Sequence, residues 1–483
     1  MDNYVIIQFF EWYVQNDGKH WDKLKKEASK LGALGVSGVW IPPVTKASGQ
    51  DSTGYDIYDL YDIGEFDQKG SIRTKYGTKE QLKEAVQALR ENGLKVYADI
   101  VLNHKAGADE TEKFQVIEVD ENDRKHVISE PYEIEGWTKF YFPGRGDKYS
   151  GFKWNFTHFT ATDKDKSTDK NSIYKIVGDG KDWSSKVDDE YNNYDYLMYA
   201  NIDYNNEAVV KEVKQWGVWL TKELKLDGFR LDAVKHIDED FMEDFINTVR
   251  ANTADDFYAV GEYWNADVNK LEEYLSNMNT KMNLFDVPLH YNFHEASLIG
   301  RSYDLTKIFA NSLVASKPLN TVTFVDNHDS QNGQALESWV EDWFKPVAYA
   351  LILLREDGYP CIFYGDYYGI GGEKPVPSKK DMLDPLLMVR KDFAYGEQED
   401  YFDHPNVIGW IRKGDEEHKD SGIAVVISNG DEGIKNMCFG KELSGKAFYD
   451  ITENRKEIIT LDEEGKGNFT VQGGSVSVWI VKK

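Results

Sequence analysis

Short apolar runs alternate with amphipathic segments along most of the chain, and this alternation restricts the possible folds more than any other feature. In residues 79–92, apolar side chains recur three or four positions apart, as in a helix that covers a sheet. Eight strands alternating with helices predict an α/β fold, a (β/α)8 TIM barrel. The eight predicted strands are residues 4–10, 36–42, 94–103, 228–232, 258–262, 285–288, 321–326 and 360–364.

Two segments interrupt or follow this pattern. The connection after the third predicted strand covers residues 105–207, is rich in Asp, Lys, Asn, Gly and aromatic residues, and lacks helical periodicity. A connection of this length normally has structure of its own, so we predict a small inserted domain that overhangs the barrel mouth. Residues 1–104 and 208–394 then form the catalytic barrel.

After residue 394 the pattern changes to short β-branched runs separated by Gly, Asp and Asn turns such as Asn429-Gly430. This pattern predicts an antiparallel β-sandwich over residues 395–483. Trp410 and Trp479 fall within its strand patterns, which favours a place in the core over a starch-binding surface.

The charge balance excludes some classes of partner. Lys and Arg total 57 against 84 Asp and Glu, so the formal net charge is −27. An acidic surface repels phosphate backbones and anionic lipid heads, and we therefore expect neither nucleic acid nor membrane partners. We expect a monomer. The first residues enter a predicted strand with no basic leader, which favours a cytoplasmic protein, with a secreted mature form as the alternative.

Acidic side chains stand where several predicted strands end, which is where chemistry occurs in such barrels. Arg230 and Asp232 are two positions apart and therefore point to the same side of their strand. Glu262 ends the neighbouring strand and Asp329 follows a strand further round. Three carboxylates are thus predicted to converge on one cleft.

Such a set is what glycosyl transfer requires, because one carboxylate must attack the anomeric carbon while a protonated carboxyl delivers a proton to the leaving oxygen. Crowded like charges raise the proton affinity of one member of the set. The neighbouring Arg230 favours the ionised form of Asp232.

The surrounding sequence resembles the four motifs of the α-amylase family of glycoside hydrolases. These motifs are Asp99-Ile-Val-Leu-Asn103-His104, Gly228-Phe-Arg230-Leu-Asp232-Ala-Val-Lys235-His236, Val260-Gly-Glu262-Tyr-Trp264 and Phe324-Val-Asp326-Asn-His328-Asp329. Further stretches resemble the bacterial liquefying and cytoplasmic α-amylases, namely Gln8-Phe-Phe-Glu-Trp-Tyr13, Gly54-Tyr55, Tyr194-Asp-Tyr-Leu-Met-Tyr-Ala200 and Trp343-Phe-Lys-Pro346.

The resemblance implies an endo-acting, retaining hydrolase of internal α-1,4 bonds in starch, glycogen or maltodextrins. Asp232 would be the nucleophile, Glu262 the general acid and then base, and Asp329 the group that stabilises the transition state. The other implied substrate-binding or orienting residues are Tyr55, His104, Arg230, Lys235, His236, Trp264 and His328. A transglycosylating or exo-acting enzyme on the same fold is the alternative. A catalytically silent carbohydrate-binding protein is disfavoured because all three carboxylates are present.

The resemblance also implies a calcium ion between barrel and inserted domain, held by Asn103, Asp195 and the backbone carbonyl of His236. The fourth ligand is an aspartate in the liquefying relatives and Asn201 here, and loss of that charge predicts weaker calcium binding. Three further acids match those that build an additional calcium–sodium cluster in the relatives, whereas Asn205 replaces another acid of that cluster. The retention of this cluster, sodium included, is left open. The three acids are Asp163, Asp182 and Asp203.

Overall fold

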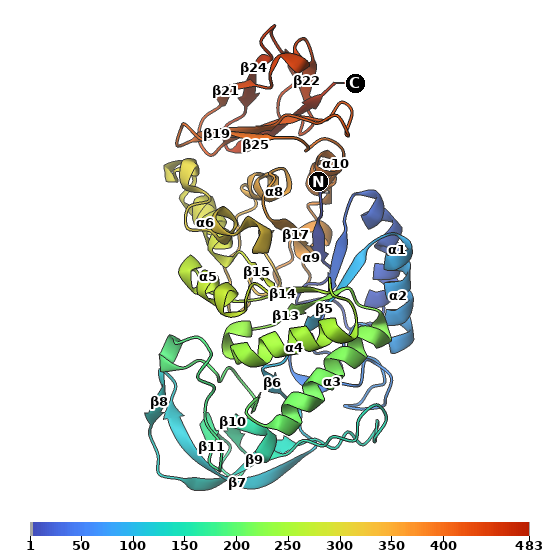
Figure 1. Cartoon of the computed structure of the whole chain (residues 1–483), viewed down its shortest axis with the longest axis vertical. Helices are drawn as coiled ribbons and strands as arrows, with labels where there is room; N and C mark the ends of the chain where they lie inside the picture. The colour runs from blue at the N-terminus through green and yellow to red at the C-terminus, as the bar shows by residue number, and fades with distance from the viewer. Residues whose placement is uncertain (1–2, 483) are drawn as a thin grey trace.

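The computed structural model describes residues 3–482, and eight parallel strands in it close into a barrel (Figure 1). The strands follow one another around the barrel in chain order, and the last pairs with the first. This closure confirms the predicted (β/α)8 barrel. The barrel strands are β1 (Ile6–Gln8), β2 (Gly38–Ile41), β5 (Lys95–Ile100), β13 (Gly228–Leu231), β14 (Tyr258–Gly261), β15 (Asn283–Phe285), β16 (Thr321–Phe324) and β17 (Tyr359–Phe363).

Helices surround the barrel and bury their apolar stripes against it, with α1 and α2 on one flank (Figure 1). The start of α2 has a capping box in which the side chains of Thr78 and Gln81 bond to each other's backbone NH groups. The main helices are α1 (His20–Ala33), α2 (Lys79–Glu91), α3 (Glu207–Leu224), α4 (Glu239–Asn252), α5 (Val268–Asn277), α6 (Val287–Ile299), α8 (Lys345–Leu353) and α10 (Lys380–Asp392). Two short helices are α7 (Leu313–Ser316) and α9 (Tyr364–Tyr368). None of the described helices is both long and apolar enough to span a membrane.

The sixth strand was predicted too late in the chain. We expected residues 285–288, whereas β15 ends at Phe285 and the next apolar residues begin α6. The Asp286 side chain accepts a hydrogen bond from the Leu289 backbone NH at 3.0 Å and so caps this helix. An apolar run of this length fits a buried helix start as well as a strand, and the cap decides between them.

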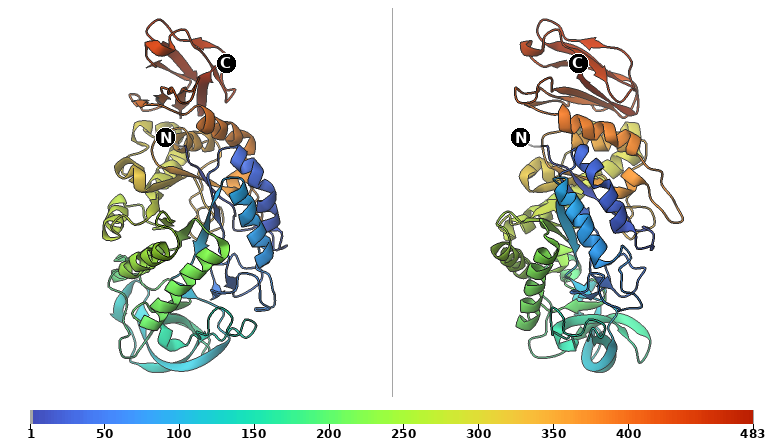
Figure 2. Two further views of the ribbon diagram at one scale, coloured as in Figure 1. Left: turned by 45° about the vertical axis from the view of Figure 1, so that its right-hand side comes forward. Right: turned by 90° about the vertical axis from the view of Figure 1, so that its right-hand side faces the viewer.

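The long excursion between β5 and α3 folds into a seven-stranded sheet of its own. Its first and last strands pair with each other, with Asn201 opposite His104, so the excursion leaves and re-enters the barrel at one place. This sheet lies at the opposite end of the molecule from the C-terminal strands (Figure 2). Its strands are β6 (His104–Lys105), β7 (Glu110–Asp120), β8 (Asp123–Val127), β9 (Tyr132–Lys139), β10 (Phe159–Asp165), β11 (Lys170–Ile176) and β12 (Ala200–Ile202), joined by the 3-10 turns η1 (Phe156–His158) and η2 (Glu190–Asn192). A two-stranded sheet of β3 (Lys46–Ala47) and β4 (Ile57–Asp59) lies in the loop after β2.

The C-terminal strands form an antiparallel six-stranded sheet and a two-stranded sheet that share an apolar core. Trp479 Nε1 donates to the Thr470 carbonyl oxygen at 3.2 Å and links the two sheets. Trp410 Nε1 donates to the Leu354 carbonyl oxygen at 3.2 Å and links this unit to the barrel. Both indoles are buried, which confirms their predicted place in the core. The strands are β18 (Gln398–Tyr401), β19 (Val407–Arg412), β20 (Ile423–Ser428), β21 (Gly433–Cys438), β22 (Ala447–Asp450), β23 (Ile459–Thr460), β24 (Lys466–Val471) and β25 (Ser475–Val481).

Replacing Trp410 tests this junction. Trp410→Ala removes a fully buried indole and its hydrogen bond, and we expect it to lower the free energy of unfolding by about 3–5 kcal/mol. The measurement is denaturant unfolding followed by circular dichroism. Trp137, whose side chain is 40% exposed, provides the control, and Trp137→Ala is expected to change stability far less. Equal losses in the two variants would contradict the structural role of Trp410.

Candidate active site

A cleft of about 1230 Å³ lies at the carboxyl ends of the barrel strands, between the barrel loops and the inserted sheet. Most of the residues that the sequence predicted to bind substrate or catalyse line it. They are Tyr55, His104, Asp232, Lys235, His236, Glu262, Trp264 and Asp329. Arg230 and His328 are fully buried beneath its floor. The inserted sheet's loop contributes Tyr194, Leu197, Met198 and Tyr199 to the opposite wall.

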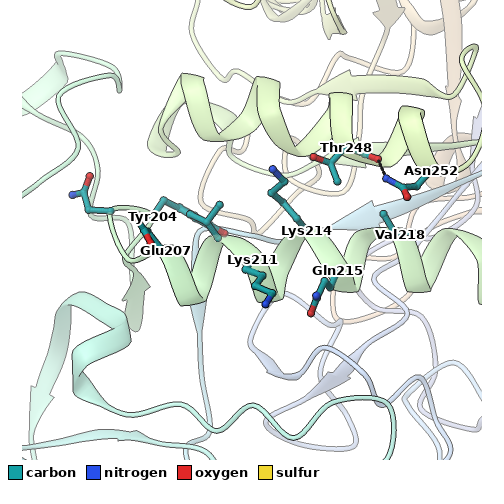
Figure 3. Close-up of a pocket in the computed structure, with 10 residues that line it drawn as sticks. Tyr204, Glu207, Lys211, Lys214, Gln215, Val218, Thr248 and Asn252 are labelled. Carbon is teal, nitrogen blue, oxygen red and sulfur yellow. Dashed lines mark hydrogen bonds between the residues drawn. The ribbon is translucent and has the colours of Figure 1, made fainter.

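A second hollow, of about 490 Å³, lies on the outside of the barrel between α3 and α4 (Figure 3). Lys211 and Lys214 project from α3, while Asn252 of α4 donates to the Thr248 carbonyl oxygen at 2.9 Å. Among the described residues that line this hollow, Glu207 is the only acid. Because it contains no pair of carboxylates, this hollow lacks the groups that the predicted chemistry requires.

Arg230 is the charge around which the carboxylates of the cleft are arranged. Its Nη1 donates to Asp99 Oδ1 at 2.9 Å and to Asp232 Oδ1 at 2.6 Å, and its Nη2 lies 3.9 Å from Glu262 Oε2. Burial opposes the charged form, but the nearby carboxylates outweigh it and raise the pKa of Arg230 well above its ordinary value. The guanidinium therefore stays charged, and both Asp232 and Glu262 lie beside it.

Burial favours the protonated forms of Glu262 and Asp329. Burial raises the pKa of Glu262 to about 8, with Arg230 opposing the shift and the charges of Asp232 and Asp329 reinforcing it. Burial likewise raises the pKa of Asp329 to about 7. The Glu262 carboxyl accepts the Ala233 backbone NH at 2.9 Å. Ala233 has a left-handed backbone (φ 48°), which turns the chain sharply after Asp232 and aims this NH at Glu262.

Aromatic rings form one wall of the cleft. The Tyr55 ring stacks on the His328 ring with centroids 5.1 Å apart, and the Trp12 ring stacks on Tyr55 at 6.0 Å. Gln8 Nε2 lies 2.9 Å from His328 Nδ1, and with the amide as donor the proton of the imidazole is on Nε2. That nitrogen is 3.2 Å from Asp329 Oδ2. Burial lowers the pKa of His328 well below its ordinary value, so the ring is neutral.

The remaining predicted residues are fixed by hydrogen bonds to loop backbone. His104 Nε2 lies 2.8 Å from the Tyr55 carbonyl oxygen, and His236 Nδ1 lies 2.7 Å from the Tyr194 carbonyl oxygen. Lys235 Nζ pairs with Glu190 Oε2 at 2.9 Å and lies 3.3 Å from the Trp264 carbonyl oxygen. These contacts join barrel loops to the inserted sheet and its flanking loop along the cleft.

Asp99 has a part in this site that the sequence did not reveal, although it begins one of the motifs. Its buried carboxylate accepts hydrogen bonds from Trp40 Nε1 at 3.0 Å, Tyr55 Oη at 2.8 Å and Arg230 Nη1 at 2.9 Å. Burial raises its pKa to about 6, against the opposing charge of Arg230. Asp99 therefore fixes the guanidinium and the stacked tyrosine together. The sequence motif showed only that β5 carries a carboxylate, and it gave no sign of the partners of that carboxylate.

Comparison with known proteins identifies the family. Residues 21–405 match the family model described as alpha amylase, catalytic domain. The chain belongs to the α-amylase family. It is 46% identical over 495 residues to the cytoplasmic alpha-amylase of Escherichia coli (strain K12), with 100% of both chains covered. It is 51% identical over 481 residues to the glucan 1,4-alpha-maltohexaosidase of Bacillus sp. (strain 707), with 99% of this chain and 93% of that protein covered.

The fold also agrees with that of solved α-amylases. The crystal structure of the alpha-amylase from Geobacillus thermoleovorans, complexed with acarbose, aligns with a TM-score of 0.66 and 17% identity. The alignment covers 100% of this chain and 98% of that chain. At this identity the likeness supports the α-amylase fold, including the barrel and the C-terminal sheets.

The four residues that the α-amylase resemblance assigned to calcium lie together. Asn103 Nδ2 is 3.2 Å from the backbone carbonyl oxygens of Asp195 and His236. Asn201 Nδ2 is 3.3 Å from Asp195 Oδ1. The set joins the third strand's end, the inserted sheet and the loop after β13.

The chemistry of this set fits a hard cation. Asp195 is buried, and among the described residues its carboxylate receives only neutral donors, the Ser184 backbone NH at 3.1 Å and the Asn201 amide at 3.3 Å. Burial raises the pKa of Asp195 to about 7. Asn201 Oδ1 is buried and has no hydrogen-bond partner within residues 3–482. A calcium ion, which prefers carboxylate, amide and carbonyl oxygens, would satisfy both groups.

The three acids that the resemblance assigned to a second cluster have partners from the chain itself. Lys181 Nζ pairs with the Asp203 carboxylate, and Lys175 Nζ lies 2.5 Å from Asp182 Oδ1. Asp163 Oδ2 accepts the Tyr199 backbone NH at 3.1 Å. Across residues 3–482, no group of three or more His, Cys, Asp or Glu residues is arranged to hold a metal ion.

Replacing Arg230 tests its place in the site. Arg230→Met leaves Asp99 and Asp232 without their buried partner, and we expect the free energy of unfolding to fall by about 3–5 kcal/mol. Denaturant unfolding measures this loss. The matched control is Arg90→Met, which breaks the Arg90–Asp227 pair on the surface, where the Arg90 side chain is 43% exposed. We expect the control to cost under about 1 kcal/mol. A tolerated Arg230→Met would mean that the acids do not depend on the guanidinium.

Proposed function

We propose that this chain is an endo-acting α-1,4-glucan hydrolase that retains the anomeric configuration through a covalent glycosyl-enzyme. The observation that carries the proposal is that Asp232, Glu262 and Asp329 line one cleft after three strand ends, with the Arg230 guanidinium 2.6 Å from Asp232 and 3.9 Å from Glu262. Starch, glycogen and maltodextrins are the proposed substrates. The names of the relatives, which are α-amylases and a maltohexaosidase, support this class of substrate.

In the first step Glu262 donates its proton to the glycosidic oxygen while Asp232 attacks the anomeric carbon. The carbon–oxygen bond to the leaving sugar breaks as the bond to the Asp232 carboxylate forms. The raised pKa of Glu262 supports its role as acid, and the 2.6 Å contact with Arg230 orients the Asp232 carboxylate for attack. In the second step the ionised Glu262 takes a proton from water, and the water oxygen displaces Asp232.

The other groups bind and orient the sugar at the cleaved bond. Tyr55 offers its ring face for stacking on the sugar, and Asp329, His104 and His328 would bond to sugar hydroxyls, Asp329 most strongly in the oxocarbenium-like transition state. His328 Nε2, beside Asp329, supports their acting together. The other three residues would contact the leaving-group side and are Lys235, His236 and Trp264.

Calcium is proposed at Asn103, Asp195, Asn201 and the His236 carbonyl, supported by the unpaired Asn201 oxygen and the buried Asp195 carboxylate. The ion would supply positive charge that links the inserted sheet to the loop after β13.

A cytoplasmic location is supported by the identity to the Escherichia coli cytoplasmic enzyme along both full lengths. We also propose that the chain is a monomer.

Asp232→Asn tests the function itself. An amide cannot form the glycosyl ester, so we expect turnover of starch to fall by at least about a thousandfold while starch binding persists. Reducing-sugar release and binding to insoluble starch measure the two effects. Asp255→Asn, at an exposed position outside the cleft, is the control and should retain full activity. Near-normal turnover by Asp232→Asn would end the assignment.

Maltoheptaose and soluble starch distinguish the proposed function from its alternative, an exo-acting or transferring enzyme. An endo-acting hydrolase gives only products shorter than maltoheptaose and lowers the viscosity of starch early. Products longer than maltoheptaose would identify transfer. A single maltooligosaccharide released without early loss of viscosity would identify exo action. The name of the maltohexaosidase relative is the reason to test for this mode.

The raised pKa of Glu262 predicts the alkaline limit of activity. The acid must be protonated for the first step, so kcat/KM should fall tenfold per pH unit above about pH 8, the folded-state pKa. The measurement is a pH profile with maltoheptaose. Maltosyl fluoride needs little protonation of its leaving group, so its reaction should lack this limb. The same alkaline limb with both substrates would assign it to a group other than Glu262.

A further inference from the structure

Asp203 is a buried carboxylate between β12 and α3, at the point where the inserted segment returns to the barrel. Its side chain is 3% exposed and pairs with Lys181 Nζ, whose side chain is 10% exposed. Asp203 Oδ1 also accepts the Asn205 backbone NH at 3.0 Å. A carboxylate this deeply buried requires a compensating charge, and here the charge comes from the chain's own lysine.

The Lys181 ammonium joins three segments of the inserted domain that are far apart in the sequence. It comes from the loop after β11, pairs with Asp203, and donates to the Thr157 carbonyl oxygen of η1 at 2.6 Å. Asn206 Nδ2 donates to the same carbonyl at 3.1 Å. The Asp203 backbone NH reaches the His158 carbonyl oxygen at 3.0 Å. These contacts close the base of the sheet against the start of α3.

The partners of Lys181 are the kinds of oxygen that a hard divalent cation also selects, a carboxylate and a backbone carbonyl. An ammonium group bonds to the same oxygens through its three donors. Once it occupies the position, its charge repels a metal ion and its donors occupy the oxygen lone pairs. The neighbouring acid, Asp182, is compensated by Lys175 in the same manner, although at a more exposed position.

We propose that Lys181 is a tethered cation that takes the place of a metal ion at Asp203, so that this part of the inserted sheet is held together without metal. Removal of the ammonium would then uncover a divalent-cation site made from the Asp203 carboxylate and the Thr157 carbonyl. The proposed calcium position at Asp195 and Asn201 is a separate set of oxygens.

The test is calcium binding and thermal unfolding of the full chain after treatment with EDTA. Lys181→Met keeps the length of the side chain and removes its charge. We expect its Tm in EDTA to fall by several degrees, and isothermal titration with Ca²⁺ to show one more bound equivalent than the wild type. Added Ca²⁺ should recover most of the lost Tm. The double variant Lys181→Met/Asp203→Asn should lose the extra equivalent and the recovery.

A second comparison does not depend on the folding of Lys181→Met. Asp203→Asn in the otherwise unchanged chain should bind as many Ca²⁺ equivalents as the wild type, because no metal is lost from a position that a lysine occupies. Loss of one equivalent in Asp203→Asn would overturn the proposal. Folded Lys181→Met that binds no additional Ca²⁺, with a Tm unaffected by the ion, would overturn it as well.

Discussion

The buried charge of Arg230 is the interaction on which the arrangement of the cleft depends. In the parallel register of the barrel, Arg230 on β13 stands directly opposite Asp99 on β5. Asp232 lies two residues on, so one guanidinium reaches a carboxylate across the sheet and another along the strand. In a chain with a net charge of −27, this buried cation allows several buried acids to lie close together. Without it, mutual repulsion would favour protonation of the whole set.

The barrel register also places the acids at different distances from the Arg230 guanidinium. Glu262 follows the strand next to β13 and lies at the far edge of the guanidinium, 3.9 Å from Nη2, whereas Asp232 takes a direct bond of 2.6 Å. Burial dominates at Glu262 and raises its pKa to about 8, although the charge of Arg230 opposes the shift. Two chemically similar carboxyl groups, which follow neighbouring strands, thus lie at different distances from a single cation.

The sequence predicted the features that depend on local pattern and failed where distant contacts decide. The eight strands and the pair Arg230–Asp232 follow from periodicity, and the cleft from the position of strand ends. The end of β15 did not, because Asp286 is fixed by backbone NH groups of Leu313 and Val314, far along the chain. The contact between Gln8 and His328 spans 320 residues, and no local spacing indicates it.

The charged side chains of the inserted sheet show the same difference between local pattern and distant contact. The resemblance identified which acids stand near Asn201, but it could not show that Lys181 reaches Asp203 from another loop. Because β12 pairs with β6, with Asn201 opposite His104, the wall of the cleft is continuous with this base of the sheet. A metal ion bound from solution would make the stability of that wall depend on the concentration of the ion. A cation supplied by a side chain is always present, so this part of the wall depends only on the fold of the chain itself.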